Sequence, residues 1–334
     1  MSWTLLPENA LPDVPSGDEL FAHPRWVGAL AAVYRFPVRW ATDGSAALPF
    51  AVLDDLAGRR VVGFPFSDYL PIDDPAVAAA LFELLGQSFP THRIVLKTRL
   101  SNEDAAMVPN ASVTRRAVYH RMDATSPPPD ANFRRNVRKG KKHGHLKRDV
   151  NQEFALDKFY ALYTWQRYRK FGSIPQPKSF FARLQAEYST EEEDAFWMCF
   201  DKNFQAASAH MFLPAGRGLF YKFGTTENAL QYLRPNNLLF DAAMELVRSG
   251  AYDFLDFGLS GTSEKYAGLR RFKASTGATE LPLTYLERRP SAYDDRTETL
   301  FKQHLGALTK TMVAQELQPD ATSTLSEHLY PYFA

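Results

Sequence analysis

Hydrophobic residues recur along this chain with two spacings, one typical of helices and one typical of strands. Helical spacing of apolar or charged residues predicts helices over residues 25–34, 75–89, 132–143, 156–171, 179–188, 237–249, 264–273 and 295–317. Short apolar or alternating runs predict strands over residues 37–40, 46–53, 59–64, 93–97, 113–122, 195–201, 206–213, 218–224, 252–257 and 278–285. Pro75 suits the first turn of a helix, and Gly250 suits the position just after one.

Residues 124–130, Ala-Thr-Ser-Pro-Pro-Pro-Asp, divide the chain into two parts with a similar order of elements. A proline-rich stretch is stiff and incompatible with a helix, so it predicts a linker. The length of 334 residues also exceeds what one hydrophobic core usually serves. We therefore expect an α/β (α+β) fold with two tandem domains and mixed, largely antiparallel sheets. The first covers residues 1–125 and the second residues 126–289, and the tail 290–334 packs back on the first.

Charge and hydropathy exclude several classes of protein. The 39 basic and 38 acidic residues give a net charge of +1, so no overall field attracts nucleic acid or membrane, and a polyanion would have to bind a local patch. The N-terminus lacks the basic and apolar regions of a signal peptide, and no apolar run approaches the roughly 20 residues of a spanning helix. We expect a soluble, cytoplasmic protein without stable membrane insertion.

Cysteine and histidine give little sign of chemistry. Cys199 is the only cysteine, which excludes an intrachain disulfide and a cysteine zinc site. It lies in the apolar run 196–200, so an inert core thiol is favoured over a nucleophile. His143 and His145 stand among lysines that would repel a cation, so we expect no metal.

The segment 133–143 concentrates positive charge. On a helix, Arg134, Arg138 and Lys142 are spaced four residues apart and lie on one face. Such a face binds phosphates of a substrate or of RNA. A solvated surface helix is the alternative interpretation.

A series of motifs follows in the second part of the chain. Four residues in these motifs have a structural interpretation beside a functional one. Asn236 suits the N-cap of a helix, Asp256 a turn cap, Phe272 a core position and Lys273 an exposed position. The motifs are Asn132–Gly140, Phe159–Arg167, Tyr221–Gly224, Arg234–Leu239, Asp256–Gly258 and Phe272–Ala278.

The order of these motifs resembles the Fem-type peptidoglycan-bridge aminoacyltransferases and their GNAT-like acyltransferase relatives. The resemblance is best from about residue 130 to 287, and a looser one covers residues 23–26 and 64–69. It implies that both expected domains are GNAT-like. It also implies transfer of an amino acid from aminoacyl-tRNA, the co-substrate, to the peptide amine of a nucleotide- or lipid-linked peptidoglycan precursor, without a cofactor. The family's long coiled-coil arm is absent, which indicates the compact form.

The resemblance also implies roles for individual residues. By position, Arg167 is similar to the arginine that holds precursor phosphates, and Tyr221 to a tyrosine of the acceptor site; Tyr163 and Asn236 in the same motifs are further substrate-binding candidates. Three residues are catalytic candidates: Phe272, Lys273 and Asp68, the last in the motif that departs most from the family. Amide formation needs a positive group where negative charge develops, which Lys273 would supply.

Two other functions remain open. An acyl-CoA-dependent N-acyltransferase acting on a sugar or cell-envelope polysaccharide precursor is one. Against it, residues 231–236 contain no glycine and include a proline without an N–H, whereas a coenzyme A pyrophosphate needs backbone donors there. A non-catalytic RNA-binding module is the other, but RNA binding alone would not require the ordered motifs.

Overall fold

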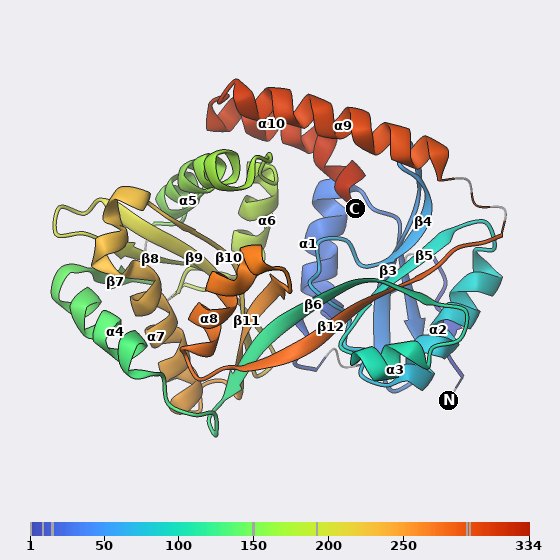
Figure 1. Ribbon diagram of the computed structural model, residues 1–334, viewed down its shortest axis with the longest axis horizontal. Coiled ribbons are helices and arrows are strands. Elements are labelled where there is room, and N and C mark those ends of the chain that lie inside the picture. Colours follow the sequence, from blue (N-terminus) through green and yellow to red (C-terminus); the bar gives the residue numbers. More distant parts are fainter. Residues whose placement is uncertain are drawn as a thin grey trace.

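The computed structural model describes residues 2–8, 10–14, 17–148, 151–191, 193–291, 293 and 295–334. Two α/β halves lie side by side, and the C-terminal helices lie across both (Figure 1). In chain order the strands are β1 (Thr4–Leu5), β2 (Val38–Thr42), β3 (Ala47–Asp55), β4 (Gly58–Gly63), β5 (Arg93–Thr98), β6 (Ser112–Asp123), β7 (His145–Lys147), β8 (Phe196–Phe200), β9 (Ala206–Ala215), β10 (Gly218–Thr226), β11 (Phe254–Gly261) and β12 (Thr279–Arg288).

All these strands form one sheet in the order β1-β2-β3-β4-β5-β12-β6-β11-β10-β9-β8-β7. Within the described residues, only the pairs β4–β5 and β10–β11 are parallel. The predicted fold class, mixed α/β with largely antiparallel strands, is confirmed. The structure adds that both halves share a single sheet.

The long strands β6 and β12 join the two halves (Figure 1). β12 comes late in the sequence, yet it lies between β5 and β6: Thr284–Arg288 pair with β5, and Thr279–Glu287 pair with β6. β6 in turn pairs with β11. The proposed division near residues 126–130 stays a prediction, because the sheet continues across it.

Two of the helices begin at an aspartate cap. Asp74 accepts a hydrogen bond from the Ala76 N–H before α2, and Asp130 accepts one from the Phe133 N–H before α4. The helices are α1 (Pro24–Tyr34), α2 (Pro75–Ser88), α3 (Asn102–Ala106), α4 (Ala131–His143), α5 (Gln152–Gln166), α6 (Lys178–Tyr188), α7 (Pro235–Arg248), α8 (Ala267–Ala274), α9 (Arg296–Ala314) and α10 (Pro319–Leu329), with a π-helical turn at Arg167–Phe171 and 3₁₀ turns at Leu20–Ala22, Asn228–Leu233, Glu264–Tyr266 and Tyr330–Phe333.

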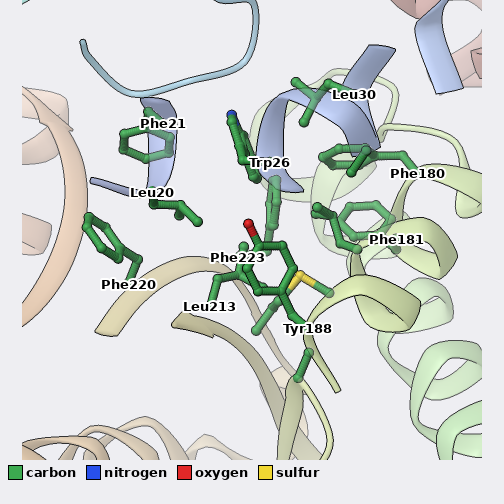
Figure 2. Packing of buried hydrophobic residues seen from close by; sticks show 14 of the residues in the cluster. Leu20, Phe21, Trp26, Leu30, Phe180, Phe181, Tyr188, Leu213, Phe220 and Phe223 are labelled. Atoms are coloured by element: carbon green, nitrogen blue, oxygen red, sulfur yellow. The ribbon is translucent and has the colours of Figure 1, made fainter. Parts of the chain in front are cut away.

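The largest hydrophobic cluster draws on both halves. Trp26 and Leu30 of α1 pack against Phe180 and Phe181 of α6, and Phe223 of β10 lies beside them (Figure 2). The rings of Phe181 and Phe223 meet edge to face with centroids 5.1 Å apart. Burial of this shared aromatic surface holds the halves together.

The C-terminal segment bridges the molecule. Glu298 near the start of α9 forms an ion pair with Arg93 of β5 (2.7 Å), while α10 packs on α5 and α6. Among the described residues, no helix combines the length and the apolar character that crossing a bilayer requires.

Candidate active site

The site is built where β10 and β11 separate. These parallel strands pair from Gly218 with Phe254 to Phe220 with Asp256, and in the described residues their pairing ends there although both continue. β11 bulges against β6 just after Asp256. At Gly258 the backbone has a φ of 73°, a conformation that suits glycine.

Asp68 lies between the separating strands. It comes from the loop that joins β4 to α2, so the first half supplies it. One carboxylate oxygen forms an ion pair with the Lys222 ammonium of β10, and the other accepts a hydrogen bond from the Leu259 N–H of β11 (3.2 Å). The side chain is 16% exposed. Asp68 therefore bridges the two strands with a carboxylate that solvent still reaches.

Lys273 of α8 contacts the same bulge. Its Nζ donates hydrogen bonds to the carbonyl oxygens of Gly258 (2.7 Å) and Leu259 (3.1 Å). The residue is only 2% exposed. Burial lowers the pKa of Lys273 to about 8, against the attraction of Asp256 and Asp68. Lys273 thus fixes the bulge and keeps a positive charge close to Asp68.

Asp256 completes the buried part of the site. Its carboxylate accepts hydrogen bonds from the Tyr69 hydroxyl (2.5 Å) and from the Gly258 N–H (2.6 Å). The second bond is the turn cap expected at this position. Burial raises the pKa of Asp256 to about 6. Neighbouring residues of one loop, Asp68 and Tyr69, therefore contact β11 and its bulge.

Tyr221 and Phe272 belong to the packing around the site. The Tyr221 ring contacts those of His210 and Phe240, with centroids 4.9 and 4.8 Å apart. Phe272 packs between Phe133 and Phe240, at 6.1 and 5.6 Å. These two contacts pack α8 against α4 and α7, so the neighbouring Lys273 points inward.

Asn236 lies in a separate pocket at the start of α7. Its Oδ1 accepts hydrogen bonds from Thr226 (2.8 Å) and the His210 Nε2–H (3.0 Å), and Ser208 Oγ, which donates to the Thr225 carbonyl oxygen (2.7 Å), lies 2.9 Å away. Burial lowers the pKa of His210 to about 3, so the ring is neutral. These two donors orient the amide and leave its NH₂ group for a ligand. The pocket, about 370 Å³, is lined by Leu162, Trp165, Gln166, Arg169, Lys170, Thr226, Glu227, Asn228, Gln231 and Asn236.

Tyr163 and Arg167 are not among the residues that line this pocket. The buried Tyr163 hydroxyl donates to Gln176 Oε1 (2.8 Å). The Arg167 guanidinium stacks over Tyr163 and Phe171, 6.0 and 5.2 Å from their ring centres. Arg167 opens the π-helical turn whose Arg169 and Lys170 line the pocket.

The three candidate phosphate-binding residues of α4 are all exposed: Arg134, Arg138 and Lys142. The opposite face of α4, with Val137 and Gly140, packs toward α7. Gly140 is required there because a Cβ would lie 2.7 Å from Leu238. This packing turns the basic face outward.

The structure therefore groups the candidates in four places. Asp68 and Lys273 both hydrogen-bond to the backbone of Leu259, and Tyr221 and Phe272 belong to the packing beside them. Arg167 stacks on Tyr163, Asn236 lines the pocket, and the basic residues of α4 face solvent. Sequence reasoning missed Lys222 and Tyr69. The sequence signal for Lys222 was a lysine inside the apolar run 219–223.

Metal and thiol chemistry have no support among the described residues. No three His, Cys, Asp or Glu side chains come together there as a metal site requires. The His145 ring instead stacks on Phe204, with centroids 6.3 Å apart. Burial raises the pKa of the Cys199 thiol to about 12, which makes it a poor nucleophile.

Comparison with known proteins identifies a domain in the second half. Residues 130–274 match the family described as acetyltransferase (GNAT) domain, and this range contains the separating strands, Lys222, Asp256 and Lys273. This part of the chain is a GNAT domain, and the protein is an acyltransferase. No curated protein matches its sequence.

Solved structures share the fold of this acyltransferase at low identity. FemX is 12% identical with a TM-score of 0.58, over 86% of this chain and 95% of FemX. L-PGS from Bacillus licheniformis is 13% identical with a TM-score of 0.52, over 87% and 98%. The C-terminal domain (DUF2156) of a putative lysylphosphatidylglycerol synthetase from Agrobacterium fabrum is 12% identical with a TM-score of 0.54, over 84% and 91%. The acyltransferase thus has the Fem-type fold.

Proposed function

We propose that this acyltransferase forms an amide bond by moving an amino acid from aminoacyl-tRNA to the peptide amine of a peptidoglycan precursor. The reaction takes place in the cytoplasm, at the point where β10 and β11 separate. One observation carries the proposal: Asp68 holds a primary ammonium, that of Lys222, between the two strands. The acceptor amine is an ammonium of the same kind.

Asp68 suits the role of general base. An acceptor amine must lose a proton before its nitrogen attacks, and a carboxylate in contact with the ammonium accepts that proton. The nitrogen then bonds to the ester carbonyl carbon, and the bond from that carbon to the ribose oxygen breaks. A second proton from the nitrogen passes to the leaving ribose oxygen, so the step balances.

Lys273 supports this step without contacting the reacting atoms. Its ammonium holds the carbonyl groups of Gly258 and Leu259, which fixes the position of the Leu259 N–H that Asp68 binds. The buried charge also favours the negative oxygen that develops during attack, since a fixed positive charge in a dry site needs no reorganisation.

The pocket beside Asn236 suits the end of the RNA donor. Arg169 and Lys170 offer cations for phosphate, and the amides of Gln166 and Asn236 offer donors for ribose hydroxyls. The basic face of α4 would bind RNA phosphates further along. Two of the structural neighbours carry related names: FemX, and the C-terminal domain of a putative lysylphosphatidylglycerol synthetase.

An acyl-CoA-dependent N-acyltransferase acting on a sugar or polysaccharide precursor is the second candidate. The match of residues 130–274 to an acetyltransferase family favours it. The start of α7 opposes it, because Pro235 lacks an N–H where a pyrophosphate would need backbone donors.

The test is a transfer assay with labelled aminoacyl-tRNA and labelled acyl-CoA, each offered with nucleotide- and lipid-linked precursors. We expect label from aminoacyl-tRNA in an amide. Asp68→Asn should lower kcat by at least about a hundredfold, because an amide side chain takes up no proton. Asp54→Asn is the control, since Asp54 is 61% exposed and pairs with Arg59 on the surface. Transfer from acyl-CoA alone, or equal kcat in both variants, contradicts the proposal.

A further inference from the structure

A row of three side chains crosses the middle of the sheet. Tyr285 of β12 stands directly opposite Lys97 of β5 on one side and Arg115 of β6 on the other. Residues in direct register point to the same face of a sheet. The contacts agree, because the Lys97 ammonium and the Arg115 guanidinium lie 5.7 and 5.1 Å from the centre of the Tyr285 ring.

Neither cation of this row has a carboxylate partner among the ion pairs of the described residues. The Lys97 Nζ donates to the carbonyl oxygen of Ser67 (2.9 Å), which leaves two of its three N–H groups. Arg115 is exposed, and its planar guanidinium rests on Tyr285. Burial, followed by the charge of Lys222, lowers the pKa of Lys97 to about 8. Lys97 and Arg115 therefore present positive charge that an anion could bind.

The row lies next to Asp68. Ser67, which holds Lys97, is the residue before Asp68, and the charge of Asp68 acts on both Lys97 and Tyr285. Around this point four cations, Lys97, Lys222, Arg115 and Lys273, lie near two carboxylates, Asp68 and Asp256. Four positive charges less two negative charges leave an excess of two.

We propose that Lys97, Tyr285 and Arg115 form a binding site for an anionic oxygen group, a carboxylate or a phosphate, that belongs to the acceptor. This inference rests on the proposed function, in which Asp68 receives the acceptor amine. The acceptor is then an amine with an anionic group close by in the same molecule. The guanidinium donates two parallel hydrogen bonds to such a group, the ammonium adds a point charge, and the Tyr285 hydroxyl adds a third donor.

Binding of simple anions tests the row without any turnover. Inorganic phosphate and malonate are titrated separately into the full-length protein at constant ionic strength, with the heat of binding as the readout. Lys97→Met and Arg115→Gln should each weaken binding of the preferred anion at least tenfold. The tighter of the two anions indicates whether a phosphate or a carboxylate belongs there.

Matched variants separate the row from general charge effects. Arg116→Gln is the control, because the neighbouring Arg116 donates to Asn102 Oδ1 (2.7 Å), away from Tyr285, and its loss removes the same charge. Arg115→Lys keeps the charge but loses the paired donors, so it should weaken binding less than Arg115→Gln does. Equal anion affinity in Lys97→Met, Arg115→Gln and Arg116→Gln overturns the inference.

The transfer assay distinguishes this inference from the proposed function. Lys97→Met and Arg115→Gln should raise the KM of the acceptor and leave kcat within about threefold, whereas Asp68→Asn lowers kcat. Anion binding at the row without any amide formation contradicts the proposed function but supports the anion-binding site. Amide formation with an unchanged KM of the acceptor in both row variants contradicts the anion-binding site but supports the proposed function.

Discussion

Burial determines how Lys273 responds to pH. Its pKa is about 8 in the fold and about 10.5 in an unfolded chain. Between these values the unfolded chain binds more protons, so the free energy of unfolding rises as pH increases from 8 toward 10. Lys273→Met removes one such group and should lower this slope by about 1 kcal/mol per pH unit. Urea denaturation at several pH values from 8 to 9.5 measures it.

The same variant bears on turnover. Loss of the ammonium releases the carbonyl groups of Gly258 and Leu259 and removes the positive charge, so kcat should fall about a hundredfold. Equal pH slopes in the variant and the parent would show that Lys273 titrates as it does in water. Full activity would remove Lys273 from the site.

Single residues show how far sequence reasoning reached. Asp68 and Lys273 were selected from motifs on different halves, and the structure brings both to Leu259. Lys222 and Lys97 were not selected, because their importance depends on register and on a loop from the other half. In the sequence alone, each is one lysine within a strand.

At the scale of elements, the turn at Gly258 controls how β11 meets Asp68. A Cβ at this position would lie 3.0 Å from the Tyr221 carbonyl oxygen and 3.4 Å from Asp68 Oδ2. Gly258→Ala should therefore lower the free energy of unfolding by about 1–2 kcal/mol through backbone strain, and should also lower kcat at least tenfold. Gly250→Ala is the control: its φ is 80°, but a Cβ there meets nothing within 4 Å. It should lose stability without losing activity.

Most elements were predictable from local pattern, and the exceptions have physical causes. α10 was missed because its buried side chains include Thr322, Ser323 and Ser326, which gives no apolar periodicity. The Ser323 hydroxyl accepts from the Lys178 N–H (2.8 Å), so polar contacts dock this helix. The π-helical turn Arg167–Phe171 has a spacing that local pattern assigns to an ordinary helix. The place of β12 depends on pairing with distant strands.

At the scale of the whole molecule, α9 is anchored by a buried carboxylate. Glu298 accepts hydrogen bonds from Arg93 (2.7 Å) and from Lys302, and it is 6% exposed. Glu298→Gln leaves the Arg93 charge less compensated and should lower the free energy of unfolding by about 1–3 kcal/mol. Glu316→Gln, at an exposed pair with Arg169, should change it by less than about 0.5 kcal/mol. Equal losses in chemical denaturation would contradict the anchor.

The location of β12 has a consequence for synthesis of the chain on the ribosome. Strands β5 and β6 emerge early, but the strand that fills the gap between them follows more than 150 residues later. Until then both carry open hydrogen-bonding edges, which attract other chains. The nascent first half therefore depends on chaperones or on rapid completion of translation, and its sheet closes only when the second half is almost finished.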